Sequence, residues 1–345
     1  MYNVEKYISE TLDSILAQTF QDFEVIVVDD CSPDNSYATV ESCLEKFNGR
    51  LTLAKMEQNS GAPGSPRNKG IELSRGEYVY FLDSDDTITP TALEEMYSLA
   101  KKFDADVVQC EKFYNVHQSI WNDAERRKSL KPTSYLTGER VLFPKPTLLD
   151  ADLEKRLSLF WHRRLVWNVC FQLIRREFIM NNEIRFCDIF AEDMLFTLCE
   201  ASCAKKYLVV PNVIYFYRRH ASSTTRTGMD VQKLFHRNVK SLTLGMRYFD
   251  NFLNKNEFFL QRVDLKYVLF DIFVWQLTKS LLSIYEKVPK YEIDGFVRKE
   301  FAGDNVALMS YIFNMMNSFR YQLIQRQKEL SAVKEQLKVM KGATP

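Results

Sequence analysis

The 345-residue sequence predicts an α/β fold, a mostly parallel sheet with helices on both faces, followed by a helical C-terminal region. Two observations lead to this prediction. Short apolar runs alternate with segments of helical period from residue 3 to residue 110, as in strands joined by helical crossovers. Two of these runs, 24–28 and 78–82, end in acidic clusters, and ligands of such sheets bind beyond the carboxyl ends of strands.

Each element follows from a local signal in the sequence. Apolar residues at helical spacing follow Asn3, which can serve as an N-cap. The nearly continuous β-branched run 24–28 indicates a strand buried on both faces. Residues 165–217 return to mixed helix and strand. The other predicted elements are a helix over 34–47, a strand over 51–56, a Gly/Pro-rich loop over 61–66, a short helix ending near Ser74, a strand over 78–82, a helix over 90–103 and a strand over 105–110.

The domain organisation follows from changes in composition along the chain. We expect one α/β domain over residues 1–225, with an irregular, charged insertion at 115–160. Residues 230–318 indicate a helical acceptor-binding or accessory region, and 319–345 a coiled-coil tail that pairs with a second copy or a partner. A helix packed on its own domain is the competing interpretation, strongest for 309–319. The seam alternates spacings of three and four, broken only at Arg326: Met309, Ile312, Met316, Phe319, Leu323, Leu330, Val333, Leu337 and Met340.

Composition excludes several classes of protein. Lys and Arg number 46 and Asp and Glu 45, so the chain lacks the basic excess of a nucleic-acid binder. Seven cysteines without a Cys-x-x-Cys pair indicate reduced, buried thiols rather than a zinc site. The longest apolar stretch, 268–277, contains Asp271 and is too short to cross a bilayer. We therefore expect a cytoplasmic protein that is soluble or peripherally bound at the inner face of the cell membrane.

The acidic clusters imply a divalent cation. Parallel strands direct Asp29, Asp30, Asp83, Asp85 and Asp86 to one crevice, where five carboxylates repel each other and any phosphate. Mg²⁺ or Mn²⁺ resolves this repulsion, because hard oxygen ligands suit these ions and the ion then bridges to a diphosphate. Caps and turns are the alternative use of Asp at strand ends. A carboxylate at the first strand end can also accept the N3–H of uracil.

Several motifs, in order, resemble family 2 glycosyltransferases of the GT-A fold. They are the segments 2–8, 14–19 and 22–30, then Arg67-Asn68-Lys-Gly70 and the stretch 76–86, so the resemblance is nearly continuous over residues 2–110. It implies that Tyr2 and Asp30 contact the nucleotide base. It also assigns Arg67 and Asp83 to donor binding, and Asp83 and Asp85 to an Asp-x-Asp metal motif with Asp85 as the direct ligand.

The same resemblance supplies a general base. Glu192-Asp193 matches the Glu-Asp motif of the family, and Asp193 is the residue that would take the acceptor proton. Taken alone, acids at a helix start only complement its dipole. Arg218 and His220 fall where family members have a loop that closes on the donor, and either could contact the diphosphate or simply lie on the surface.

The resemblance implies an enzyme that transfers a sugar, with inversion, from a nucleoside diphosphate donor, UDP-linked, to an acceptor hydroxyl. Its expected cofactor is Mn²⁺ or Mg²⁺, and its expected acceptor is a glycan or lipid-linked glycan of the bacterial surface. Neither the sugar nor the acceptor can be read from these residues. Three alternatives remain open: a phosphoryl-accepting receiver domain, a sugar-phosphate nucleotidyltransferase and an inactive scaffold. The acids at 83–86 and 192–193 exceed what a receiver domain needs, and the segment 3–6 lacks the Gly-rich basic loop of a nucleotidyltransferase.

We also expect the chain to lack the first strand of its sheet. Family members begin with an apolar strand that runs into the Tyr-Asn dipeptide, whereas here Met1 directly precedes Tyr2. Such a strand lies inside the sheet, so its loss would leave the strand 24–28 with an unpaired edge.

Overall fold

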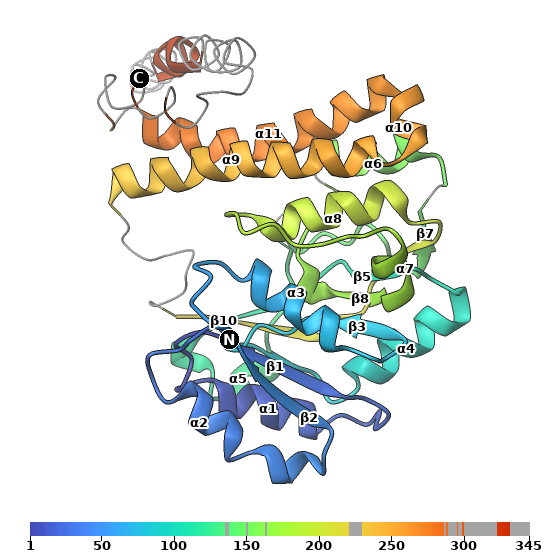
Figure 1. The fold of residues 1–345 in the computed structure, drawn as a ribbon, viewed down its shortest axis with the longest axis vertical. Helices are drawn as coiled ribbons and strands as arrows, with labels where there is room; N and C mark the ends of the chain where they lie inside the picture. The colour runs from blue at the N-terminus through green and yellow to red at the C-terminus, as the bar shows by residue number, and fades with distance from the viewer. Residues whose placement is uncertain are drawn as a thin grey trace, which may run out of the picture. The chain divides into compact units, whose positions relative to one another are not determined.

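The computed structural model describes residues 1–134, 138–149, 151–162, 164–220, 230–285, 288, 295, 299 and 323–331. Contacts divide the chain into two units, Met1–Gly228 with Leu244–Phe273, and Met229–Thr243 with Val274–Pro345. The first unit contains every strand named below and all of the predicted site residues (Figure 1).

The first 110 residues alternate strands and helices in the predicted order. The apolar run 24–28 forms β1, and the Gly/Pro-rich loop leads into α3 as expected. The elements are α1 (Ile8–Leu16), β1 (Val25–Asp29), α2 (Ser36–Glu41), η1 (Leu44–Phe47), β2 (Leu51–Lys55), α3 (Gly64–Leu73), β3 (Tyr78–Tyr80), β4 (Thr87–Ile88), α4 (Ala92–Phe103) and β5 (Val107–Cys110).

Three details of this region differ from the sequence-based expectation. Asn3 has a φ of 55° and does not cap α1, whose first residue is Ile8. The expected helix over 34–47 is two short helices, α2 and η1, because Ser, Thr, Val and Cys have low helix propensity in the middle of this segment. The expected strand over 78–82 ends at Tyr80, so the acidic loop begins earlier than predicted.

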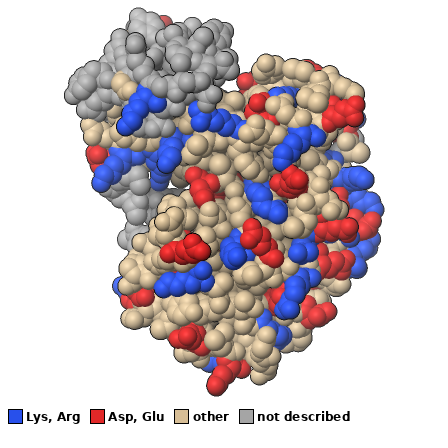
Figure 2. Space-filling view, viewed as in Figure 1, with Lys and Arg blue, Asp and Glu red and all other residues tan. Residues whose placement is uncertain are grey.

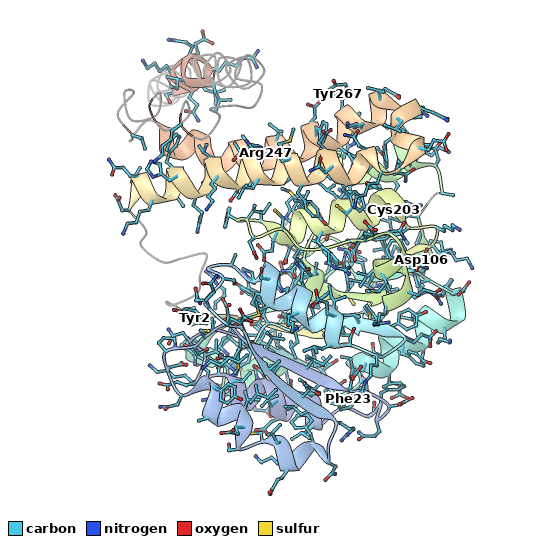
Figure 3. The ribbon with its side chains drawn as sticks, in the orientation of Figure 1. Tyr2, Phe23, Asp106, Cys203, Arg247 and Tyr267 are labelled. Carbon is cyan, nitrogen blue, oxygen red and sulfur yellow. The ribbon has the colours of Figure 1, made fainter. Side chains whose placement is uncertain are left out.

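Strands β1 and β2 form a parallel two-stranded sheet, in which Val25 pairs with Leu51 and Asp29 with Lys55. Figure 3 shows Phe23 and Tyr2 at opposite ends of this pair, with Tyr2 near the carboxyl ends. At the other edge of β1, the backbone bonds among the described residues come from Met1, whose amino group donates to Val28 O at 2.6 Å. Its carbonyl accepts from Asp30 N at 2.9 Å.

The largest sheet of the described residues is mixed rather than mostly parallel, which corrects that part of the predicted fold. Its order is β3-β8-β5-β9-β7, and β8 (Gln172–Arg175) lies antiparallel between β3 and β5. Strand β9 (Tyr207–Val210) is parallel to β5, and β7 (Thr147–Leu148) is antiparallel to β9. Helices α4 and α7 (Arg176–Asn181) pack on this sheet.

The expected irregular insertion over 115–160 contains regular elements. It begins in β6 (Tyr114–His117), which pairs in parallel with β10 (Tyr215–Arg219), while β10 also pairs with β4. The sheet β4-β10-β6 therefore ties this segment to the acidic loop that precedes β4. The remaining elements between residues 118 and 203 are η2 (Gln118–Ile120), α5 (Ala124–Lys128), α6 (Leu153–Trp161), η3 (Val169–Phe171) and α8 (Glu192–Cys203).

The C-terminal part is helical, as predicted, with α9 (Val231–Asn254), α10 (Glu257–Gln261) and α11 (Val263–Tyr285). Residues 323–331 are helical too, and Leu323 and Leu330 are exposed. The other predicted seam residues lie outside the described residues. A search of the described residues found no helix long and apolar enough to span a membrane. On the face drawn in Figure 2, acidic and basic side chains are interspersed, in keeping with the net charge of +1.

Candidate active site

Arg67 lies at the centre of the site. Its guanidinium donates to three carboxylates from two distant parts of the chain: Nη2 to Asp83 at 2.9 Å, Nη1 to Glu192 at 2.9 Å and Nη1 to Asp193 at 2.5 Å. It also lies over the Phe186 ring, 5.3 Å from the centroid. The buried guanidinium of Arg67 thus binds two other residues predicted from the sequence, Asp83 and Asp193.

Helix α3 is fixed in position by contacts with the segment 186–188. The Asn68 side chain donates to Phe186 O at 2.9 Å and accepts from Phe186 N at 2.8 Å. The Ser65 amide donates to Asp188 at 2.7 Å, and the Ser65 hydroxyl donates to the same carboxylate. A Cβ at Gly64 would lie 2.6 Å from Asp188 Oδ1 and 3.1 Å from Cys187 O, so a larger residue there would displace the Asp188 carboxylate from Ser65. The Arg-Asn pair therefore divides its work, with Asn68 anchoring the helix and Arg67 reaching the carboxylates.

Asp193 lies in the first turn of α8. Burial raises the pKa of Asp193 well above its usual range, the Arg67 guanidinium counteracts this, and Glu192 and Asp83 add to the rise. Ala191, the N-cap of α8, has φ 68°, a left-handed conformation that is strained for a residue with a Cβ. Strain of this kind concentrates at functional sites. The two acids sit at the positive end of the helix dipole, which favours the carboxylate form.

Asp85 faces a different partner. Its Oδ2 lies 2.8 Å from His220 Nε2, and the His220 ring packs against the Tyr7 ring in a tilted arrangement, with a centroid distance of 4.6 Å. Burial and the neighbouring Asp83 raise the pKa of Asp85, while His220 lowers it. Asp83 and Asp85 thus repel each other as carboxylates, and each is partly compensated by a nearby basic group. His220 was assigned no definite role from the sequence, and the structure brings it to this pair.

Asp86 is a structural residue, which corrects the expectation that it faces the crevice with the others. It is almost fully buried, and its two oxygens accept from Tyr215 Oη at 2.6 Å and from Arg218 N at 2.7 Å. Burial raises the pKa of Asp86, with Asp85 and Asp83 adding to the rise. Its role is to join the acidic loop to β10.

Arg218 supports the acidic loop from behind, a role that the sequence did not reveal. Its side chain is buried between the rings of Trp121, 3.7 Å from the centroid, and Tyr7, at 4.9 Å. Nε donates to Asp85 O at 2.8 Å, and Nη2 donates to Glu10 at 2.5 Å. Trp121 Nε1 donates to the same Glu10 oxygen at 2.5 Å. The expectation that Arg218 lies free to contact a diphosphate or solvent is therefore wrong in this structure.

The Asp86–Tyr215 hydrogen bond gives a stability test. Tyr215→Phe keeps the ring but leaves one buried Asp86 oxygen without its donor, so we expect the free energy of unfolding to fall by about 1–3 kcal/mol. Urea denaturation of this variant checks the value. Tyr267→Phe, at a ring that is 63% exposed, is the matched control and should unfold like the wild type. Equal loss in both variants would reject the structural role of Asp86.

Asp30 and Tyr2 lie at the carboxyl end of β1. Asp30 accepts from Ser60 N at 2.9 Å and from Ser60 Oγ at 2.8 Å, so it holds the loop that leads to α3. Tyr2 is 50% exposed, and its ring is open to a ligand. Asp29 is buried and accepts from Ser32 N. The ends of β1 and β3 are electrostatic neighbours, since burial lowers the pKa of the Met1 amino group while Asp29, Asp30 and Asp83 counteract it.

Within the described residues, no group of three or more His, Cys, Asp and Glu side chains is arranged to hold a metal ion. Asp83 and Asp85 nevertheless fit a Mg²⁺- or Mn²⁺-type role. Such ions are commonly bound through one or two carboxylates, waters and substrate phosphates rather than by an all-protein cage. Burial and, second to it, the neighbouring Asp83 raise the pKa of Asp85, and a cation would relieve the cost of keeping both groups as carboxylates.

The fold is that of the GT-A class of glycosyltransferases. A solved structure of Staphylococcus aureus TarS 1–349 in complex with UDP matches with a TM-score of 0.62 and 22% identity, covering 96% of this chain and 90% of that one. At this identity the match supports the fold alone.

Sequence comparison identifies the family. The glycosyl transferase family 2 model matches residues 1–154. The uncharacterized glycosyltransferase EpsJ of Bacillus subtilis is 33% identical over 227 residues, which are 65% of this chain and 61% of EpsJ. The cholesterol galactosyltransferase of Borreliella burgdorferi is 31% identical over 266 residues, 73% of this chain and 70% of that protein. The chain belongs to glycosyltransferase family 2. The poly(ribitol-phosphate) beta-N-acetylglucosaminyltransferase TarS of Staphylococcus aureus is 31% identical over 220 residues. The matched part of the chain spans only 61% of the length of EpsJ and 34% of the length of TarS.

Proposed function

We propose that the protein transfers a sugar from a UDP-linked donor to an acceptor hydroxyl with inversion, in the synthesis of a bacterial surface glycan. The observation that carries this proposal is the guanidinium of Arg67 between Asp83, of the donor-side acidic loop, and Asp193, the candidate base on α8. A donor site and a base belong next to each other in an inverting enzyme, because the acceptor must attack the anomeric carbon opposite the leaving diphosphate.

Donor binding is proposed for the carboxyl ends of β1 and β3. The exposed Tyr2 ring offers a stacking surface for the base, and a carboxylate such as Asp30 retains acceptor capacity for a base N–H besides its bonds to Ser60 and Asn59. The preference for UDP is supported by the match to TarS, which has been solved with UDP and with UDP-GlcNAc. Residues 1–225 would form this donor-binding domain, and the helices over 230–318 would serve the acceptor.

Asp83 and Asp85 would hold the divalent cation, with His220 Nε2 beside Asp85 as a neighbouring nitrogen donor. When bound, Mn²⁺ or Mg²⁺ supplies stabilisation of the charge that develops on the leaving diphosphate. Arg218 and Asp86 hold the backbone of this loop in place. The loop therefore loses little conformational entropy when the donor binds.

Asp193 would take the proton from the acceptor hydroxyl. As a carboxylate it accepts a proton at Oδ, and Arg67 and the α8 N-terminus favour that carboxylate against the effect of burial. Glu192 shares the Arg67 Nη1 group and limits the directions in which Asp193 can turn. Its bond to Arg67, which also binds Asp83, therefore directs the Asp193 carboxylate toward the donor side.

The acceptor remains a class rather than a compound. We propose a glycan or lipid-linked glycan, used in the cytoplasm or at the inner face of the membrane, because the relatives named above include a poly(ribitol-phosphate) transferase and a cholesterol transferase. The acceptors in these two names are a polymer and a sterol, so acceptors differ among the relatives. We also propose that residues 319–345 pair as a coiled coil with a second copy or a partner; the structure describes residues 323–331 of this segment.

The test is a donor screen. The protein is incubated with Mn²⁺ and a panel of UDP-, GDP- and dTDP-sugars, and released nucleoside diphosphate is measured with and without lipid extract as acceptor. We expect release from one or a few UDP-sugars, stopped by EDTA. Release from none of them, or binding of no nucleotide, would overturn the proposed function.

A further inference from the structure

The group around Arg67 has an unusual charge balance. One guanidinium faces three carboxylates, Asp83, Glu192 and Asp193, and each bond is 2.9 Å or shorter. The Arg67 side chain is only 14% exposed, so solvent screens these charges poorly. Among the described residues, Arg67 forms its ion pairs with these three carboxylates. The cluster therefore carries excess negative charge, and its members compete for a single cation.

The two ends of the guanidinium reach different parts of the site. Nη2 holds Asp83 in the acidic loop, and Nη1 holds Glu192 and Asp193 in the first turn of α8. Asp83 is 38% exposed and stands toward the donor side, whereas Asp193 is 20% exposed. Arg67 is thus a direct, single-residue link between the proposed donor site and the proposed base, across a sequence separation of 110 residues between Asp83 and Asp193.

The rest of α3 cannot follow if the guanidinium moves. Asn68 is bonded twice to the backbone of Phe186, and Ser65 is bonded to Asp188. The Phe186 ring supports the guanidinium from one face. If Arg67 changes partners, only the Arg67 side chain therefore moves, and helix α3 stays in place.

We propose that Arg67 is a positioning residue that couples donor binding to the base: it divides its bonds between Asp83 and the Glu192-Asp193 pair without donor, and gives them to the pair when Asp83 turns to the cation and diphosphate. This inference rests on the proposed function and extends it. The physical reason is competition. A carboxylate drawn to a divalent cation is a weaker partner for a guanidinium, and the cation repels the guanidinium toward the remaining carboxylates.

The competing role is the one inferred from sequence, in which Arg67 contacts the donor directly. The two roles predict different results. A donor ligand should contribute mainly to nucleotide affinity, whereas a positioning residue should change how α8 responds to the nucleotide. Arg67→Lys distinguishes them, because lysine keeps the charge but cannot bond both ends of the cluster with one planar fork.

The experiment measures amide hydrogen exchange in a peptide spanning residues 188–198, with and without Mn²⁺ and UDP, together with the Kd of UDP by calorimetry. In the wild type we expect Mn²⁺ and UDP to slow exchange in the first turn of α8 about tenfold, the factor expected when one charge-assisted hydrogen bond is redistributed. In Arg67→Lys we expect this response to disappear while the Kd stays within about threefold of the wild type.

The matched control is Arg75→Lys, the same substitution at an arginine whose side chain is 85% exposed. It should respond like the wild type, and urea midpoints of all three proteins report any loss of fold. An α8 response in Arg67→Lys equal to the wild type, or a large loss of UDP affinity with the response retained, would overturn the coupling role. A wild type that binds UDP with no change in α8 would also overturn it. Failure of the wild type to bind UDP with Mn²⁺ would instead reject the proposed function.

Discussion

Replacing Asp85 by alanine is expected to abolish both turnover and Mn²⁺-dependent nucleotide binding. Within the Asp-x-Asp pair, Arg67 bonds the carboxylate of Asp83, whereas the carboxylate of Asp85 bonds His220. Its carboxylate is desolvated and lies beside Asp83, so its charge is poorly compensated without a cation. Removing it takes away one of the two anionic ligands proposed for the ion.

The fold should survive this substitution. Arg218 Nε holds the backbone carbonyl of residue 85, not the carboxylate, and Asp86 anchors the loop through Tyr215. The measurement is calorimetry of UDP binding with and without Mn²⁺, followed by nucleotide release from the active donor. Asp22→Ala, at an exposed aspartate beside Phe23, which Figure 3 shows at the opposite end of β1, is the matched control and should behave like the wild type. Full activity of Asp85→Ala, or of the wild type in EDTA, would contradict a metal role.

The local elements could be predicted from the sequence because their signals are local. The strand-like segments at 24–28 and 105–110 became β1 and β5, and the helix after the Gly/Pro-rich loop became α3. Strand order could not be predicted in the same way. Strand β8 enters between β3 and β5 in the antiparallel sense, and that choice depends on contacts between residues about 65 to 95 positions apart.

For the candidate site, the sequence named residues but not their partners. The order of the acidic motifs identified Asp83, Asp85 and Asp193, and the structure brings Asp83 and Asp193 onto one guanidinium. What the sequence did not reveal is which partner each acid would choose. Asp86 and Asp85 are adjacent, yet one is buried under β10 and the other faces His220.

The support of the acidic loop was missed for a physical reason. Arg218 is a charged residue on strand β10. Its supporting role depends on its contacts with Tyr7, Trp121 and Glu10, which lie far from it in the sequence. An arginine in a basic run such as 218–219 resembles a solvated surface residue in any local reading. A weak signal was available in the tryptophan at 121, since a large aromatic residue inside a charged insertion needs a burial site.

Asp193→Asn is expected to lower sugar transfer by roughly 10²–10⁴-fold, the range typical for loss of a general base. Asparagine keeps the size of the side chain and an oxygen that can accept from Arg67, but it cannot take a proton at neutral pH. Donor affinity should change little, because Asp83 and Asp85 are untouched. Stability should not fall either, since burial raises the pKa of Asp193, so its carboxylate opposes folding at neutral pH and the neutral amide does not.

The control for this prediction is the neighbouring residue. Glu192→Gln removes a carboxylate from the same Arg67 Nη1 group but leaves the proposed base, so its loss of activity should be clearly smaller than that of Asp193→Asn. The measurement is the transfer rate at saturating donor as a function of pH, with urea midpoints to report the fold. In the wild type the rate should fall on the acid side as Asp193 becomes protonated, and in Asp193→Asn that acid limb should vanish along with most of the rate. If Asp193→Asn transfers sugar at the wild-type rate, or if Glu192→Gln is the more damaging change, the base is not Asp193.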